Sequence, residues 1–332
     1  MLLKNLIYIS LLEIILFFLI NKISLSFNLL DYPLKRKIHK KAVPYTGGVV
    51  LGFIYLLFVF FTDYNIRFIN LTLSFSFLVM IFGFFDDRFN LKPGTKIILQ
   101  IISIYILIQE GLYLLDLGTY EGYGVLKLGS FDKIFSIMCC LLLINSINYN
   151  DGVDGLASTI FIILITSFSL ICLIEKDVET SKYLVLLNLP VIIFLFFNFN
   201  IFNFPKIFLG DSGSNMLGFT ITFISIGLYV ERNIHPAIII WPLAYLVYEF
   251  FSLNLIRLIK KKGMFNPGLD HLHHILLKKK LGSLSVNIII PTISLLISIL
   301  GIFSFYNFGA TFSLILFLIM LVIYTYVRIK II

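Results

Sequence analysis

Five short polar clusters interrupt an otherwise apolar chain, and two of them are acidic. The first acidic cluster is the adjacent pair Asp86-Asp87, and the second contains Asp151 and Asp154 among asparagines and glycines. Adjacent carboxylates at a low-dielectric boundary stay ionised only when a cation compensates their charge. Carboxylates together with phosphate oxygens are the ligands that Mg²⁺ prefers. The acidic clusters therefore predict a site for a divalent cation and a phosphorylated ligand.

The other three clusters supply positive charge and tight turns. One is basic and contains Arg36 and His39, one reads Gly-Asp-Ser-Gly over 210–213, and one is a His-x-His-His run over 271–274. Glycines permit turns at helix ends, where backbone N–H groups approach a phosphate. Lysine, arginine and histidine side chains are expected to carry the charge that neutralises the remaining phosphate oxygens. With the acidic clusters, they predict metal-assisted phosphoryl transfer at a membrane surface.

The chain that carries these clusters has the composition of a membrane protein. Its 332 residues are 59% hydrophobic and 13% charged, whereas soluble proteins are about 45–50% apolar and about 25% charged. No soluble fold has room to hide so many apolar side chains, because its surface must be wetted. We therefore predict an all-α polytopic protein in a lipid bilayer, with residues 1–332 as a single domain. The net charge of +8 is attributed to cytoplasmic loops and anionic ligands, with no nucleic acid as a partner.

Eleven apolar segments are candidate transmembrane helices, each of which needs about 20 residues. They lie at residues 3–21, 46–62, 66–85, 95–115, 131–148, 156–174, 183–202, 213–230, 235–257, 286–304 and 308–327. The loops after the odd-numbered segments, together with the C-terminus, carry eighteen of the 26 lysines and arginines. Because positively charged loops remain in the cytoplasm, we predict a cytoplasmic C-terminus, an external N-terminus and cytoplasmic catalytic loops.

Each cluster also has a structural interpretation when it is considered alone. The pair Asp86-Asp87 could begin a solvated loop, and the glycines beside Asp151 could form an Asx-type turn. Asp211 could cap a helix N-terminus, and the histidine run could be a structural metal site. Independent features of this kind would occur on both sides of a membrane, whereas all five clusters fall in the odd-numbered loops. A shared functional site explains that distribution.

Taken together and in this order, the five motifs resemble those of the polyprenyl-phosphate N-acetylhexosamine-1-phosphate transferase family, which is the bacterial glycosyltransferase family 4. The resemblance extends from Asp31 to His274, and it is to the branch that uses UDP-GlcNAc and undecaprenyl phosphate. It implies that undecaprenyl phosphate attacks the β-phosphorus of a UDP-N-acetylamino sugar, with GlcNAc as the expected sugar, and that UMP is released. Such a reaction initiates lipid-linked glycan synthesis for the cell envelope.

The resemblance also implies a cofactor, a location and a set of site residues. The cofactor is Mg²⁺, with Mn²⁺ as a substitute, and the location is the bacterial cytoplasmic membrane; a homo-oligomer is left open. The implied catalytic residues are Asp86, Asp87 and Asp211, and the implied metal ligands are Asp211, Asn148 and Asp87. The residues expected to bind substrate are Asn148, Asp151, Asp154, Phe208, Lys96, His271, His273, His274, His39 and Arg36. Among these, Phe208 matches an aromatic residue that stacks on uracil.

Some positions depart from the family's pattern. Many members carry Asp-Arg before the histidines, but this chain has Gly268-Leu269, which removes an anion contact and leaves the donor sugar open. The asparagine that the family uses for uracil has no matching position, so that Asn200 and Asn203 are the candidates. The segment 43–48 matches the muramoyl-pentapeptide branch poorly, and a transferase of that branch is the alternative within the family.

A transporter with cytosolic anion-binding loops is the alternative from a different class. It predicts ionisable residues deep within several transmembrane helices and a two-fold repeat. The sequence has few such residues in its apolar segments and shows no repeat. We therefore favour the transferase.

Overall fold

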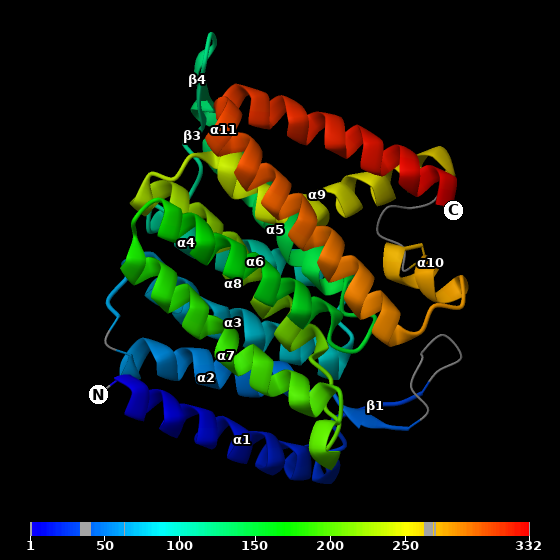
Figure 1. Ribbon diagram of the computed structural model, residues 1–332. Coiled ribbons are helices and arrows are strands. Elements are labelled where there is room, and N and C mark those ends of the chain that lie inside the picture. Colours follow the sequence, from blue (N-terminus) through cyan, green and yellow to red (C-terminus); the bar gives the residue numbers. More distant parts are fainter. Residues whose placement is uncertain (1, 34–40, 63, 262–267, 269, 332) are drawn as a thin grey trace.

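The structure, a computed structural model, describes residues 2–33, 41–62, 64–261, 268 and 270–331, which form a bundle of helices (Figure 1). The long helices are α1 (Leu2–Ser26), α2 (Gly47–Phe61), α3 (Arg67–Phe89), α4 (Pro93–Gln109), α5 (Asp132–Tyr149), α6 (Leu156–Ile174), α7 (Val178–Asn198), α8 (Gly210–Arg232), α9 (Pro236–Ile259) and α11 (Ser283–Ile331). The short elements are α10 (Leu272–Lys278) and the 3₁₀ turns η1 (Gly129–Phe131) and η2 (Ile201–Asn203). Each predicted apolar segment overlaps a long helix, and the last two both lie on α11.

Helix α11 is broken once along its length. At Gly309 the backbone has φ +81° and ψ 175°, which is not helical, and the two halves diverge there (Figure 1). By length and composition, eight helices of the described chain could cross a membrane, whereas α2 and α4 are shorter apolar helices. The all-α polytopic fold is confirmed, and the number of eleven crossings stays a prediction.

Two small antiparallel sheets add to the helices. β1 (Leu30–Asp31) pairs with β2 (Val43–Pro44), and β3 (Asp116–Tyr120) pairs with β4 (Gly124–Lys127). The second pair is a hairpin whose turn contains Gly122 with φ +79°, a backbone conformation that L side chains rarely adopt. The sequence predicts neither sheet, because these short strands show no long alternation of apolar and polar residues.

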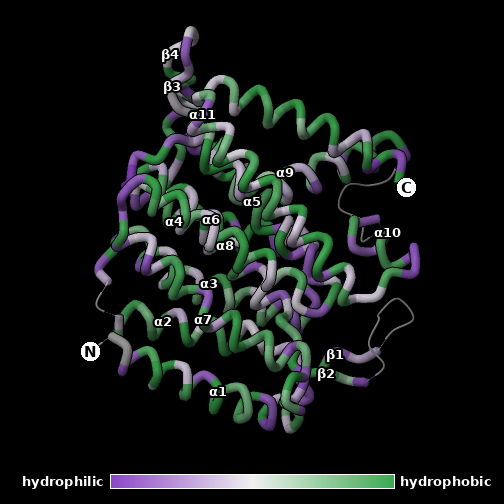
Figure 2. Tube along the Cα trace, in the orientation of Figure 1, coloured by the Kyte–Doolittle hydropathy of each residue, from purple (hydrophilic) through white to green (hydrophobic). Residues whose placement is uncertain are grey.

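The polar clusters collect at one end of the bundle. This end also holds β1, α10 and the C-terminus, and it lies opposite the N-terminus (Figure 1). Figure 2 shows polar residues gathered toward the ends and apolar residues along the helices between them. At the end away from the clusters, Arg67 forms ion pairs with Glu110 at 3.1 Å and Glu231 at 3.0 Å. The side of the membrane that each end faces stays a prediction.

Helix α8 is the centre of the bundle. Of its most apolar stretch, 83% of residues are buried, compared with 22% for the peripheral α1. α8 packs most extensively against α3 and α5. The N-terminus of α8 therefore lies where several cluster-bearing loops meet.

Candidate functional site

The N-terminus of α8 is held by a carboxylate from α3. The backbone N–H of Asp211 donates to Oδ1 of Asp87 at 2.9 Å, and that of Ser212 donates to Oδ2 at 3.0 Å. The first N–H groups of a helix have no partner within the helix and carry a partial positive charge. Asp87 satisfies two of them, whereas no side chain at the N-cap position does so. The interpretation in which Asp211 caps this helix is therefore wrong, because the carboxylate that accepts the first N–H groups is that of Asp87 on α3.

Glycines allow α2 and α3 to approach this helix start closely. A Cβ atom at Gly83 would lie 2.5 Å from Cα of Ser212, and one at Gly48 would lie 2.0 Å from the backbone nitrogen of Gly213. The N–H of Gly48 donates to the carbonyl of Leu209 at 2.9 Å. Small residues at such contacts let helix backbones come together in membrane proteins. These close backbone contacts hold in place the segment that precedes α8, which includes Phe208.

Lys96 bridges two of the predicted catalytic aspartates. Its Nζ forms an ion pair with Oδ2 of Asp86 and lies 3.3 Å from Oδ2 of Asp211. Oδ1 of Asp86 accepts a hydrogen bond from the backbone N–H of Leu91 at 3.0 Å. The amide of Asn148 donates to Oδ1 of Asp211 at 2.9 Å. The two neighbouring aspartates therefore differ: Asp87 accepts from α8, and Asp86 faces the Lys96 ammonium.

Asp151 adds a fourth carboxylate from the loop between α5 and α6. Among the described residues its side chain makes no hydrogen bond or ion pair. Burial, and then the negative charges of Asp211 and Asp87, raise the pKa of Asp151 well above its usual value. One lysine does not neutralise these carboxylates, so that a cation bound beside Asp151 would stabilise their ionised forms.

The oxygen-rich donor set fits Mg²⁺ in kind. Among the described residues, no three His, Cys, Asp or Glu side chains are already arranged to hold a metal ion. Mg²⁺ is commonly held by one or two carboxylates, with phosphate and water completing its shell, so that the carboxylates of Asp211 and Asp151 would be enough in number. Both oxygens of Asp87 accept N–H groups and the nitrogen of Asn148 faces Asp211. Ligation by Asp211, Asn148 and Asp87 stays a prediction.

A second group of residues surrounds Phe208. Nζ of Lys206 lies 2.5 Å from Oδ2 of Asp154 and 5.4 Å from the centre of the Phe208 ring. The amide of Asn198 donates to the carbonyl of Ile207 at 2.9 Å. Sequence reasoning missed Lys206 and Asn198, although a basic residue two positions before a predicted stacking aromatic was a usable signal.

The asparagine candidates for uracil need a correction. Asn198 is buried and lines the same cavity as Phe208. Asn200 and Asn203 are exposed and do not line it. The side chain of Asn200 donates to the carbonyl of Phe204 instead. The physical reason is that α7 ends at Asn198, and the positive φ angles of the next asparagines turn the chain away.

The three histidines pack together at the start of α10, where His271 is the N-cap residue, and face the acidic loop. The ring centres of His271 and His273 are 5.6 Å apart, and those of His273 and His274 are 4.1 Å apart. A Cβ atom at Gly152 would lie 2.5 Å from Nε2 of His273. Burial, followed by the Arg257 charge, lowers the pKa of His271 to about 4. Burial also lowers the pKa of His273 to about 2 and that of His274 below its usual value.

The expected positive charge of the histidines is therefore wrong for this fold. At neutral pH the three imidazoles are neutral, because their pKa values are all lowered. A neutral imidazole still donates one hydrogen bond to a phosphate oxygen. Among the described residues, the positively charged side chains that line the cavity are Lys96, Lys206 and Arg257.

We expect acid to destabilise the folded protein through these histidines. A histidine whose folded pKa is lowered stays neutral in the fold, whereas the unfolded chain binds a proton below about pH 6.5. Stability is thus fully present above that pH and is lost as the pH falls toward the folded pKa of about 4 for His271. Thermal unfolding in detergent between pH 7 and pH 4.5 measures this loss. In His271→Gln the pH dependence should be shallower; an unchanged dependence would contradict the assignment.

The predicted site residues come together in one cavity of about 2050 Å³. Its lining includes all eleven predicted site residues that the structure describes: Asp86, Asp87, Lys96, Asn148, Asp151, Asp154, Phe208, Asp211, His271, His273 and His274. Arg36 and His39 lie outside the described residues. The cavity continues away from the polar residues between α5, α8, α9 and α11, where apolar side chains such as Met138, Leu243 and Leu318 line it. A polar chamber is thus continuous with a long apolar arm.

Comparison with known proteins places this geometry in context. The profile of glycosyl transferase family 4 matches residues 69–229. An undecaprenyl-phosphate alpha-N-acetylglucosaminyl 1-phosphate transferase of Yersinia pestis is 26% identical over 90% of this chain and 83% of its own length. The protein of the same description from Escherichia coli (strain K12) is 25% identical over 97% of this chain and 89% of its own length. A probable undecaprenyl-phosphate N-acetylglucosaminyl 1-phosphate transferase of Bacillus subtilis (strain 168) is 27% identical over 77% of this chain and 72% of its own length.

Proposed function

We propose that this chain, which belongs to glycosyl transferase family 4, transfers N-acetylglucosamine 1-phosphate from UDP-GlcNAc to undecaprenyl phosphate. The relatives described above are named for transfer of this sugar phosphate to this lipid carrier. The observation that supports the proposal most is the continuity of the cavity: a chamber lined by carboxylates, Lys96 and histidines opens into an apolar arm between α5, α8, α9 and α11. A lipid phosphate needs both environments at once.

In the proposed reaction, an oxygen of the lipid phosphate attacks the β-phosphorus of UDP-GlcNAc. A new P–O bond forms, the bond between that phosphorus and the bridging oxygen breaks, and UMP leaves with the bridging oxygen. Lys96 lies between Asp86 and Asp211 and neutralises phosphate charge, while Asp86 orients the lipid phosphate or accepts its remaining proton. Asp211 and Asp151 are the residues that would hold Mg²⁺, whose charge makes UMP a better leaving group.

The nucleotide is proposed to bind at the other side of the chamber. Phe208 offers a ring face for stacking on uracil, which contributes about 1–3 kcal/mol per base in known complexes. Its ring is already covered from one direction by the Lys206 ammonium, which Asp154 holds. Asn198 fixes the carbonyl of Ile207 and thereby the backbone that presents Phe208. The diphosphate then lies between Phe208 and the histidines of α10.

One experiment tests the reaction, its cofactor and its orientation. Sealed inverted membrane vesicles containing the protein are given undecaprenyl phosphate and a panel of radiolabelled UDP-amino sugars, including UDP-MurNAc-pentapeptide, with Mg²⁺, with Mn²⁺ or with EDTA. We expect lipid-linked sugar and UMP from UDP-GlcNAc with either metal, and none with EDTA. Right-side-out vesicles should be inactive, because the proposed chamber faces the cytoplasm. Failure of every sugar to reach the lipid would refute the transferase, and use of the pentapeptide donor alone would favour the muramoyl-pentapeptide branch.

A further inference from the structure

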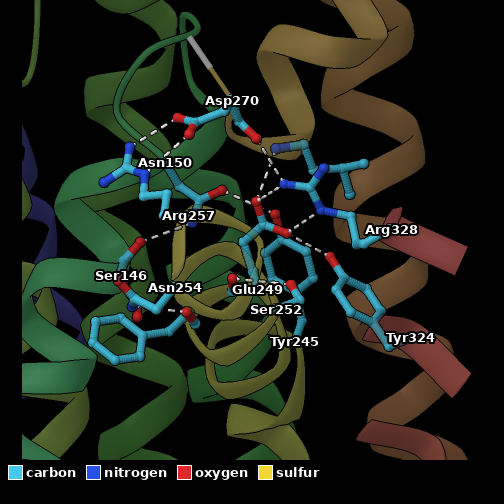
Figure 3. Close-up of polar contacts among 12 residues, drawn as sticks. Ser146, Asn150, Tyr245, Glu249, Ser252, Asn254, Arg257, Asp270, Tyr324 and Arg328 are labelled. Carbon is cyan, nitrogen blue, oxygen red and sulfur yellow. Dashed lines mark hydrogen bonds and ion pairs between the residues drawn. The ribbon is translucent and has the colours of Figure 1, made fainter. Parts of the chain in front are cut away.

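A buried ion pair joins α9 to the end of α11 next to the start of α10. Glu249 of α9 is 5% exposed and Arg328 of α11 is 1% exposed. Nε of Arg328 donates to Oε2 of Glu249 at 2.9 Å, and Nη2 donates to Oε1 at 2.7 Å. The hydroxyl of Tyr324 donates to the same carboxylate at 2.8 Å. Figure 3 shows these side chains converging on Glu249.

The same pair binds the backbone where α10 begins. Oε1 of Glu249 accepts the N–H of Leu272 at 2.8 Å, and Nη2 of Arg328 donates to the carbonyl of Asp270 at 2.9 Å. These two residues flank His271 in the chain. A second ion pair holds Asp270, whose carboxylate accepts from Nε and Nη2 of Arg257 at 3.0 and 2.8 Å (Figure 3). This interaction with Arg257 lowers the pKa of Asp270 to about 2.

Helix α10 needs such support, because it is only seven residues long. Isolated helices shorter than about 12–15 residues are marginal in water, so that packing and hydrogen bonds must hold it in place. One turn before Glu249, the hydroxyl of Tyr245 donates to Oδ1 of Asn150 at 3.0 Å. Asn150 directly precedes Asp151. A single face of α9 thus contacts both the acidic loop and the start of the histidine helix.

The energetics of a buried ion pair indicate that this pair orients the groups around it and adds little to the free energy of unfolding. Removing two charges from water costs several kcal/mol per ion, and well-packed apolar residues in their place are often as stable or more so. A bidentate arginine fixes both distance and orientation. The Glu249–Arg328 pair uses this geometry to fix a backbone N–H on one side of His271 and a carbonyl on the other.

We propose that Glu249 and Arg328 are positioning residues that hold α10, and with it His271, His273 and His274, against the acidic loop. The expected effect on kcat rests on the proposed function, whereas the expected effect on the position of α10 does not. The proposal makes the end of α11 part of the site, although Arg328 is 54 residues beyond His274 and its sequence context predicts only a cytoplasmic charge.

The test replaces both charges at once, as Glu249→Met with Arg328→Met. We expect this double variant to fold with nearly unchanged thermal stability, because no charge is left unpaired, whereas Arg328→Met alone is destabilised. Amide hydrogen exchange over residues 270–278 should become faster in the double variant. Its kcat should fall about 10–100-fold, since small displacements of catalytic groups have effects of this size.

Controls separate this role from ordinary packing and from the proposed reaction. Tyr248→Phe removes another hydrogen bond between α9 and α11, from its hydroxyl to the carbonyl of Phe317 at 2.9 Å, and should leave exchange in α10 and kcat unchanged. Arg328→Lys keeps the charge but cannot bridge Glu249 and Asp270. This variant should also speed amide exchange in α10 and lower kcat, and it provides the test if the double variant does not fold. Wild-type exchange and kcat in either variant would overturn the inference, whereas an inactive wild type with fast exchange in the variants would refute only the proposed function.

Discussion

Replacing Asp211 by asparagine is expected to lower kcat about a thousandfold while the protein stays folded. The substitution removes the charge that faces both Lys96 and the candidate cation position beside Asp151. A metal ion supplies several kcal/mol of transition-state stabilisation, and each 1.4 kcal/mol or so is a factor of ten in rate. The backbone N–H of residue 211 still donates to Asp87, so that the start of α8 is preserved.

Release of UMP measures this loss, and its dependence on Mg²⁺ concentration shows whether metal affinity is the cause. A matched control is Asp132→Asn, in the first turn of α5 at the other end of the bundle, which should behave like the wild type. Asp87→Asn should differ from both. Its side chain keeps one oxygen that accepts an N–H of α8, but its NH₂ group faces the other N–H, so that one of the two hydrogen bonds is lost. The loss costs about 1.5–3 kcal/mol and lowers thermal stability as well as activity. Near-normal turnover of Asp211→Asn would contradict its role.

The distribution of polar residues along the sequence predicts, for a simple physical reason, which side chains lie near one another. In a membrane protein the apolar segments are long and their ends alternate between two sides. Clusters such as Asp86-Asp87 and the histidine run must therefore meet if their loops share a parity. The structure brings together every described residue of the predicted site. The parity of the loops predicts at which end of the bundle the polar clusters lie. It does not predict which of their atoms contact one another.

What the sequence does not predict depends on pairings in three dimensions. Asp154 was expected to contact substrate, but its partner Lys206 lies 52 positions away. Glu249 lies within an apolar segment and its partner Arg328 is 79 positions further on; no local pattern links them. The neutral histidines are a similar case, because their pKa values depend on burial that only the packed fold reveals.

A large effect on folding is expected from Gly48→Ala. A Cβ atom at this position would lie 2.0 Å from the backbone nitrogen and 2.3 Å from the Cα of Gly213. Backbone atoms cannot move aside as a flexible side chain can, so that α2 and α8 must separate. Overpacking typically costs about 1–3 kcal/mol and at times more. The separation also strains the hydrogen bonds from Gly47 and Gly48 to the carbonyls of Phe208 and Leu209.

We therefore expect Gly48→Ala to unfold at a lower temperature in detergent and to lose about a hundredfold in kcat, because Phe208 and Asp211 are displaced together. The matched control is Gly94→Ala in α4, where an added Cβ atom meets nothing within 4 Å. There the methyl group should leave stability unchanged or raise it by up to about 1 kcal/mol, since alanine favours helices over glycine. If the two variants unfold at the same temperature, the glycine contact between α2 and α8 does not position the site. If Gly48→Ala is destabilised but keeps its kcat, the contact supports the fold alone.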